Sequence, residues 1–453
     1  MNPKELNPIL YIYKKNQLVG YLHFYRGQYQ FFYADEYIKK SGSKPLTPDM
    51  PLTDKVLSSQ QLFTVFEQVI PEGQDRKFLE RKAKSANDFE LLSLLKDIYG
   101  DLSFSKTLLS FNKESYKIDY LDVKTEILGE HSFPNIIELE LKIDDEKLFP
   151  SSSNNIRYPS GLSGFQNKIS VIINNRGIRQ RKNSKEKSYH FLKPYHKQKA
   201  NPNSKEYLPH LAINEHLFMT FAKNELGFDV PYSAIIKRSE DEEYHYLVKR
   251  YDRYEGYRFS CDEFASYVNL NSEDKYLIST EQLFKGIKKY LTLKKERLIL
   301  LKYYFYSMLI VHEDMHSKNL SLITDSHKIL MAPLYDIATT GIYQGFTRET
   351  ALSIGGKFSN ISPHVFYELV KLLEVNEKSF KKAAADILLK YTDKLPEYFD
   401  KLPDVKFFKR TKINVKPQVI KSISFVDRLR LQHHARIMQF KKKGWYQYLH
   451  LES

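Results

Sequence analysis

Short segments of alternating hydrophobic and polar positions open the chain. Ile9, Tyr11 and Tyr13 alternate along one face, a polar turn follows, and apolar residues resume at 18–22. Residues 28–33 form a third segment of this kind. Because successive side chains of a strand point to opposite faces, a period of two between polar turns predicts β-strands. We therefore expect the chain to begin with a group of strands.

Helical spacing replaces this alternation after residue 60. Apolar residues recur at helical intervals over 60–69, which predicts a first helix. A second helix is predicted over 88–98, started by Asn87 or Asp88 and stopped by Gly100. The first hundred residues are thus expected to form a small α+β unit.

Strand patterns return in the middle of the chain. Residues 117–143 show strands and one short helix, and a polar tip at 174–177 predicts a hairpin. The further elements predicted here, in chain order, are strands at 168–173 and 188–192, a helix at 210–226, and strands at 232–237 and 244–250.

Helical patterns dominate beyond Tyr257. The predicted helices are 281–290, 294–311, 362–373, 377–391 and 425–441, the last of them basic. A group of strands with one helix, followed by a group of helices, is the element order of a two-lobed kinase. We predict an α+β, protein-kinase-like fold with a leading domain at 1–112, a nucleotide-binding N-lobe at 113–255 and a helical C-lobe at 256–453.

Composition supports several folded domains in a reducing compartment. The chain has 453 residues, more than the about 250–300 that one core usually serves. Its 42% hydrophobic content argues against disorder. It has no apolar run of membrane-spanning length and no basic-then-apolar secretory signal. Cys261 is the only cysteine, which excludes disulfides within one chain and cysteine-rich zinc sites. These features predict a cytoplasmic protein without a membrane segment.

The net charge of +15 has two interpretations. It favours an anionic partner, such as nucleic acid, ATP or an acidic protein face. It is equally typical of a lysine-rich composition from an AT-rich genome, because the lysines are spread along the whole chain.

The segment after the helix predicted at 294–311 carries the strongest chemical signal. Asp314 stands five residues before Asn319, the spacing of kinase catalytic loops, in which the Asp accepts a hydroxyl proton and the Asn holds Mg²⁺. Asp336 follows the next strands, where kinases place a second metal ligand. The spacing alone is weak, but with His316 and Lys318 it becomes specific. A zinc site on Asp314 and His316 would need a third ligand, and none is nearby.

A loop rich in small residues precedes the hairpin. Small side chains let backbone N–H groups approach phosphate oxygens, although most such loops are plain turns. The residues of this loop that we expect to bind ATP are Gly161, Ser163, Gly164, Gln166 and Lys168.

Three other places complete the predicted nucleotide site. Lys193 ends a strand, from which a lysine reaches the α- and β-phosphates in kinases. Glu215 on the next helix is a partner for it, or else an ordinary surface residue. Lys249 and Tyr251 occupy a hinge position whose backbone would hold adenine. The polar segment 338–350 is interpreted as a substrate loop or, equally, as a plain surface loop.

In combination these segments resemble the HipA family of bacterial serine/threonine kinases. The leading domain carries the resemblance at 18–22, 28–33, 45–52, 66–76 and 100–102. The later motifs are S-G-x-Q-x-K at 163–168, Lys193, Asn214-Glu215, D-x-H-x-K-N at 314–319, P-x-Y-D at 333–336 and S-I-G-G-K at 353–357. The last ninety or so residues match weakly.

The resemblance implies an ATP- and Mg²⁺-dependent serine/threonine protein kinase, the toxin of a toxin–antitoxin module. It implies phosphorylation of a translation component, typically an aminoacyl-tRNA synthetase, with growth arrest. It also implies a small helix-turn-helix antitoxin, which would make the contact with DNA. Many relatives carry an autophosphorylated serine where this chain has Gly161, so Ser160 and Ser163 are the candidate replacements.

Two alternatives remain open at this point. Small-molecule kinases use a similar set of Asp and Asn residues, but their leading domains do not resemble this one. A kinase-fold regulatory protein that holds a DNA-bound partner is the other, motivated by the +15 charge and the basic last helix.

Overall fold

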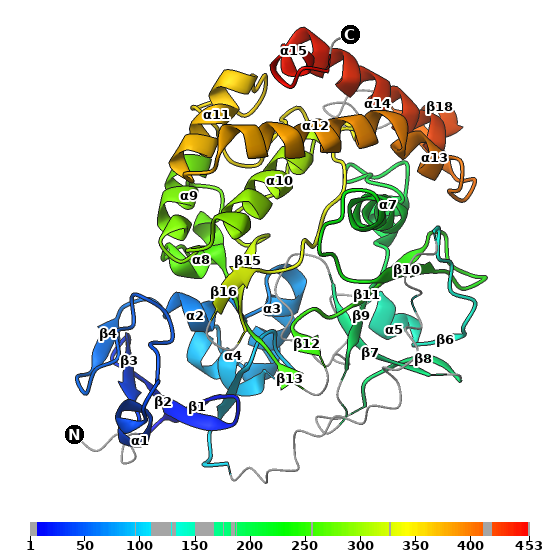
Figure 1. Ribbon diagram of the computed structural model, residues 1–453. Coiled ribbons are helices and arrows are strands. Elements are labelled where there is room, and N and C mark those ends of the chain that lie inside the picture. Colours follow the sequence, from blue (N-terminus) through cyan, green and yellow to red (C-terminus); the bar gives the residue numbers. More distant parts are fainter. Residues whose placement is uncertain are drawn as a thin grey trace.

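The computed structural model describes residues 7–95, 97–109, 128, 133–149, 167–174, 176–182, 186, 188–254, 257–325, 328–410 and 419–451. Figure 1 shows two sheets beside each other, one in the leading domain and one in the N-lobe, with the helices of the C-lobe above both in this view. The boundaries at 112 and 255 stay predictions. None of the described helices is long and apolar enough to cross a membrane.

An antiparallel sheet forms the base of the leading domain. The described strands lie in the order β4-β3-β2-β1-β5. Their bounds are β1 (Ile9–Lys14), β2 (Gln17–Tyr25), β3 (Gln28–Tyr33), β4 (Leu57–Ser59) and β5 (Leu102–Ser105). The three strands predicted from the alternating pattern are therefore confirmed. Their inner faces share a hydrophobic core with the helices of this domain.

The helices of the leading domain are α1 (Asp35–Lys39), α2 (Thr64–Glu67), α3 (Gly73–Ala83) and α4 (Asp88–Leu94). The helix predicted over 60–69 is reduced to α2, because the Ser59 hydroxyl accepts the N–H of Gln61 in a local turn and Pro71 follows soon after. The second predicted helix ends at Leu94, and Asp97 beyond it adopts a positive φ of 60°.

The N-lobe sheet differs from the predicted hairpin. Its order is β10-β11-β9-β7-β8-β6, with α7 (Leu211–Asn224) packed on β10 and β11. The bounds are β6 (Leu141–Lys142), β7 (Ile169–Asn174), β8 (Gly177–Gln180), β9 (His190–Lys193), β10 (Ser233–Ile236) and β11 (His245–Lys249).

The polar tip after β7 turns directly into β8, a strand that the pattern did not predict. Asn174 pairs with Gly177, whose φ is 120° and where a Cβ would lie 2.5 Å from the carbonyl oxygen of Glu140. Only glycine fits such a turn. β9 then returns on the other side of β7. The sequence after Gly177 is too polar to have signalled a strand.

The C-lobe is built around α10 (Lys294–Ile310), whose side chains are buried over most of its length. Around it lie α8 (Phe264–Tyr267), α9 (Thr280–Lys288), α11 (Pro363–Leu372), α12 (Glu377–Asp393), α13 (Leu395–Phe399), α14 (Phe425–Lys442) and α15 (Trp445–Tyr448). The five helices predicted from periodicity are confirmed within a few residues at each end.

Two short β-structures complete the C-lobe. One sheet has the order β14-β15-β16, with β14 (Ser260–Glu263), β15 (Ser321–Asp325) and β16 (Lys328–Met331), and it frames the catalytic-loop segment. The other pairs β17 (Lys406–Arg410) with β18 (Val419–Ser424). β14, β17 and β18 were not predicted, because they are short and interrupted by charged residues.

Candidate active site

A cavity of about 840 Å³ lies where the leading domain and the two lobes meet. Its wall contains the predicted residues Lys168, Lys193, Glu215, Tyr251, Asp314, His316, Lys318, Asn319 and Asp336. These residues are separated by up to 168 positions in the sequence, and the fold brings them to one cavity. The leading domain adds four residues to the same wall, Gln68, Val69, Glu72 and Tyr99.

A buried cluster of opposite charges occupies the N-lobe side of the cavity. The ammonium of Lys193, at the end of β9, lies 2.7 Å from Oε1 of Glu215 on α7 and also contacts Oδ1 of Asp336. The ammonium of Lys168 lies 3.6 Å from Oδ2 of Asp336. Glu215 is only 7% exposed, so it is not an ordinary surface residue of the helix.

The charges in this cluster shift one another's protonation. Burial alone would lower the pKa of Lys193, but the carboxylates of Asp336 and Glu215 outweigh burial and raise it. Burial alone would raise the pKa of Asp336, but Lys168 and Lys193 hold it well below its usual range. Burial raises the pKa of Glu215 despite the nearby Lys193. Lys193 is therefore a cation and Asp336 a carboxylate at neutral pH.

The backbone around Asp336 is fixed from α7. Asp336 has a φ of 53°, a left-handed conformation that is uncommon outside glycine. Three residues later, Thr339 donates its N–H to Oδ1 of Asn214 at 3.0 Å and accepts from Nδ2 of Asn214 at 2.8 Å. Asn214 thus ties α7, which carries Glu215, to the chain that carries Asp336.

The catalytic-loop segment begins where α10 ends. Val311 caps the helix with a φ of 60°, and the ring of His312 hydrogen-bonds through Nδ1 to the carbonyl oxygen of Ala338 at 2.7 Å. Asp314 follows with 56% of its side chain exposed to the cavity mouth. This exposure leaves the carboxylate accessible to a substrate.

Two aromatic side chains hold the loop around Asp314. The hydroxyl of Tyr276 donates a hydrogen bond to Oδ1 of Asp314, and the Tyr276 ring meets His316 edge-on with centroids 4.9 Å apart. His316 is buried and accepts the N–H of Lys318 through Nδ1 at 3.2 Å. Burial lowers the pKa of His316 to about 4, although Asp314 opposes this shift. His316 is therefore neutral at pH 7 and supports the loop. No motif had indicated Tyr276.

Lys318 is held by polar partners on three sides. Its ammonium lies 2.8 Å from Oε1 of Glu72, 3.6 Å from Oε2 of Glu263, and donates to the hydroxyl of Ser272 at 2.6 Å. The catalytic role of Lys318 stays a prediction, and these contacts fix the direction of its side chain. Glu72 lies in the segment 66–76 that carries the family resemblance, but no sequence pattern linked it to Lys318.

Asn319 and Asp336 provide oxygen atoms that suit Mg²⁺. Asn319 donates through Nδ2 to the carbonyl oxygen of Asp314 at 2.7 Å, so Oδ1 is the atom that remains for a cation. Amide and carboxylate oxygens are the ligands that this hard cation prefers. Within the described ranges, no group of three or more His, Cys, Asp or Glu residues could hold a metal ion. These donors therefore fit a cation that takes its other ligands from water or phosphate.

The hinge end of the cavity is aromatic. The rings of Tyr251 and Tyr335 are stacked with centroids 5.3 Å apart, and Tyr99 of the leading domain lies 5.9 Å from Tyr251. Lys249 does not reach this wall, because its N–H donates to the carbonyl oxygen of Tyr232 and its ammonium lies over the Tyr232 ring. Of the two predicted hinge residues, only Tyr251 lines the cavity.

The segment 338–350 also contributes to the wall. Thr340, Tyr343 and Arg348 line the cavity, and the N–H of Thr347 donates to Oε1 of Glu313 at 3.2 Å. The plain-surface-loop interpretation of this segment is therefore wrong. Ser160, Gly161, Ser163, Gly164 and Gln166 lie outside the described residues.

Models of two protein families match the chain in order. The HipA N-terminal domain matches residues 10–105, and the HipA-like C-terminal domain matches residues 160–397. "Putative kinase Y4mE" of Sinorhizobium fredii is 25% identical over 342 residues, which are 73% of this chain and 76% of that protein.

A solved structure shares the overall fold. It is HipA of Shewanella oneidensis MR-1, determined with HipB and its operator DNA. It superposes with a TM-score of 0.62 at 18% identity, covering 94% of this chain and 96% of HipA. The C-terminal family model alone spans more than half of the chain. With both family domains present in order and the two-lobed fold in common, this chain belongs to the HipA family.

Proposed function

We propose that the chain is an ATP- and Mg²⁺-dependent serine/threonine protein kinase, the toxin of a toxin–antitoxin module. The observation that carries this proposal is the convergence of Lys193, Glu215 and Asp336 on the cavity that also contains Asp314 and Asn319. Phosphoryl transfer depends mainly on positioning and charge neutralisation, and this set supplies both.

Each residue has a distinct role in the proposed reaction. Asp314 orients the acceptor hydroxyl and takes its proton, while the hydroxyl oxygen bonds to the γ-phosphorus and the bond to the leaving ADP oxygen breaks. Lys193 neutralises phosphate oxygens, and Glu215 holds its ammonium in place. Asn319 and Asp336 would hold Mg²⁺, which neutralises the charge on the phosphates when bound.

The relatives support a kinase activity and an antitoxin partner. One relative is named as a kinase, and the Shewanella HipA was solved with HipB and operator DNA. We therefore propose a small helix-turn-helix antitoxin as partner, with DNA bound only through it. The proposed substrate is a translation component such as an aminoacyl-tRNA synthetase.

The regulatory DNA-binding alternative loses part of its motive. The basic helix α14 uses two of its arginines inside the fold: Arg428 donates from Nε to the carbonyl oxygen of Ile342 at 2.8 Å, and Arg436 lies 2.7 Å from Glu349. Arg436 is 1% exposed. These charges brace the C-lobe and are not available to nucleic acid.

The test is phosphorylation of cell extract with radiolabelled ATP and Mg²⁺, comparing the wild type with Asp314→Asn. Labelled protein bands seen only with the wild type support a protein kinase, and mass spectrometry of each band names the substrate. A band at the chain's own mass reports autophosphorylation, for which Ser160→Ala and Ser163→Ala are the assigning variants. Label found only in small molecules would instead indicate a small-molecule kinase.

A further inference from the structure

We propose that the leading domain is a positioning element of the catalytic cavity, holding the hinge through Asp97 and the catalytic loop through Glu72. This inference rests on the kinase activity proposed above. It assigns a catalytic purpose to a domain that contributes no catalytic group of its own. Two buried charged contacts lie at opposite ends of one cavity.

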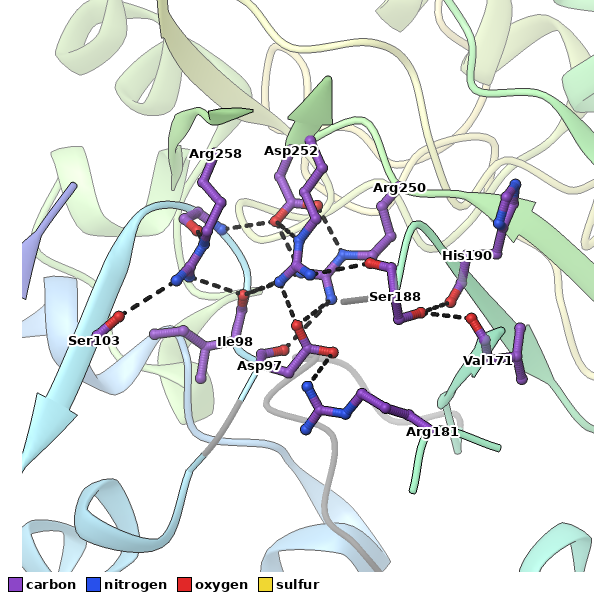
Figure 2. A network of polar contacts seen from close by, with 12 residues as sticks. Asp97, Ile98, Ser103, Val171, Arg181, Ser188, His190, Arg250, Asp252 and Arg258 are labelled. Atoms are coloured by element: carbon purple, nitrogen blue, oxygen red, sulfur yellow. Dashed lines mark hydrogen bonds and ion pairs between the residues drawn. The ribbon is translucent and has the colours of Figure 1, made fainter. Parts of the chain in front are cut away.

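At the hinge end, Asp97 lies among buried arginines (Figure 2). Its Oδ1 lies 3.3 Å from Nη1 of Arg250 and also contacts Arg253, and its Oδ2 lies 3.0 Å from Nη1 of Arg181. Burial alone would raise the pKa of Asp97, but Arg253 and Arg250 outweigh it and hold the pKa well below its usual range. Arg250 has no exposed side-chain area. The leading domain thus supplies the carboxylate that offsets the free-energy cost of burying these cations.

The backbone next to Asp97 accepts hydrogen bonds from the hinge side chains and donates one to them. The carbonyl oxygen of Ile98 accepts from Nη2 of Arg250 at 3.0 Å, and that of Gly100 accepts from Nε of Arg258 at 2.7 Å. In return, the N–H of Gly100 donates to Oδ2 of Asp252 at 3.1 Å. Figure 2 shows these contacts converging on one turn of the leading domain. The turn is therefore joined to the hinge by ion pairs and by backbone hydrogen bonds.

This turn also places a side chain in the cavity. Tyr99 lies between Ile98 and Gly100 and lines the cavity wall beside Tyr251. The guanidinium of Arg250 lies 5.0 Å from the centre of the Tyr99 ring. The contacts that hold the hinge therefore also position the Tyr99 ring in the aromatic wall of the proposed nucleotide site.

At the opposite end, Glu72 holds the catalytic loop. Glu72 caps the start of α3, and its two oxygens lie 2.8 Å from Lys318 and 2.7 Å from Lys275. Burial alone would raise the pKa of Glu72, but the two lysines lower it to about 2. Lys318 immediately precedes Asn319, the proposed metal ligand. Glu72 is therefore connected to the metal end of the site through one backbone linkage.

The pattern of contacts indicates positioning and not only domain docking. Ion pairs between buried side chains fix the direction of particular side chains, which apolar packing between domains does not. If Glu72 loses its charge, Lys318 keeps Glu263 and Ser272 as partners. The fold should then persist while Asn319 loses one restraint, which separates a positioning effect from unfolding.

The experiment compares four forms of the full chain: wild type, Glu72→Gln, Lys318→Gln and the double variant. The matched control is Glu80→Gln, on the same helix α3, whose carboxylate pairs with Arg76 of its own helix. For each form, kcat, the KM for ATP, the Mg²⁺ concentration at half-maximal rate and the thermal shift caused by Mg²⁺-ATP are measured. Residues that orient metal ligands typically change metal affinity or activity about 10–100-fold.

We expect Glu72→Gln to lower kcat and to raise the Mg²⁺ requirement about tenfold, with a smaller thermal shift from Mg²⁺-ATP. The effects of the two single substitutions should not add in the double variant, because both remove the same contact between Glu72 and Lys318. Tyr99→Leu should instead raise the KM for ATP more than it lowers kcat, since it changes the hinge wall.

Two results would overturn the inference while leaving the kinase assignment intact. One is a Glu72→Gln protein that behaves like Glu80→Gln in rate and Mg²⁺ requirement. The other is a lower melting temperature whose loss of folded protein accounts for all lost activity, with an unchanged Mg²⁺ requirement. If Asp314→Asn is as active as the wild type, the proposed function fails first.

Discussion

The hydroxyl of Tyr276 donates a hydrogen bond to the carboxylate of Asp314, the residue proposed to orient the acceptor hydroxyl. Tyr276 comes from the turn between α8 and α9, and its ring also supports His316. One oxygen of Asp314 is thus engaged by the protein, which leaves the other for the substrate. This contact is the most specific constraint on the orientation of Asp314.

Replacing Tyr276 with phenylalanine removes only this hydroxyl. A hydrogen bond to a charged group contributes about 1.5–3 kcal/mol. We therefore expect Tyr276→Phe to lower kcat about tenfold or more, with the KM for ATP unchanged, because the ring still packs on His316. Steady-state kinetics at saturating Mg²⁺ measures both. An increase in kcat would mean that Tyr276 competes with the substrate for Asp314 and does not orient it.

Lys193→Met should affect stability as well as nucleotide binding. Lys193 is the cation between Glu215 and Asp336, and removing one partner of a buried charge group costs about 3–5 kcal/mol. Urea unfolding should show this loss, and the KM for ATP should rise. Lys197→Met, at a site 55% exposed, is the matched control and should change neither. A fully stable Lys193→Met protein would show that the two carboxylates are not ionised together.

The contribution of the buried histidines to stability should fall as the pH drops from about 6.5 toward 4, opposed by Glu215 and Glu243, whose pKa burial raises to about 7. Burial lowers the pKa of His316 to about 4 and that of His210 likewise to about 4, from 6.5. In this window the unfolded chain binds protons that the folded chain does not, so acid favours unfolding by up to about 1.4 kcal/mol per pH unit for each histidine. Urea unfolding at pH 7.0 and 5.5 measures the slope. His316→Gln should make it shallower, and an unchanged slope would contradict a neutral buried His316.

The parts of the site that could be predicted from the sequence are those carried by local patterns. The spacing of Asp314 and Asn319 and the position of Asp336 after two strands needed no knowledge of the fold. The five long C-lobe helices were likewise predictable, since each carries its hydrophobic period over many residues.

Contacts between distant segments had no such signal. Glu72 and Lys318 are in different domains, so no local pattern links them. Asp97 has the sequence context of an ordinary turn residue, and only the fold places it beside the hinge arginines. The motif likewise gave the type of residue at Lys318 but not its partner Glu72. Strand β8 was not predicted because its polar residues give no strand pattern, although it pairs with β7 in the sheet.

The central claim is tested most directly by measuring the separate roles of Asp314 and Asp336. Binding of Mg²⁺-ATP, by calorimetry, and single-turnover phosphoryl transfer are measured for the wild type, Asp314→Asn and Asp336→Asn. The account predicts that Asp314→Asn binds Mg²⁺-ATP nearly as the wild type but transfers phosphate about 10²–10⁴-fold more slowly. It predicts that Asp336→Asn loses binding as well as turnover. Transfer at the wild-type rate in either variant would contradict the assignment of this site.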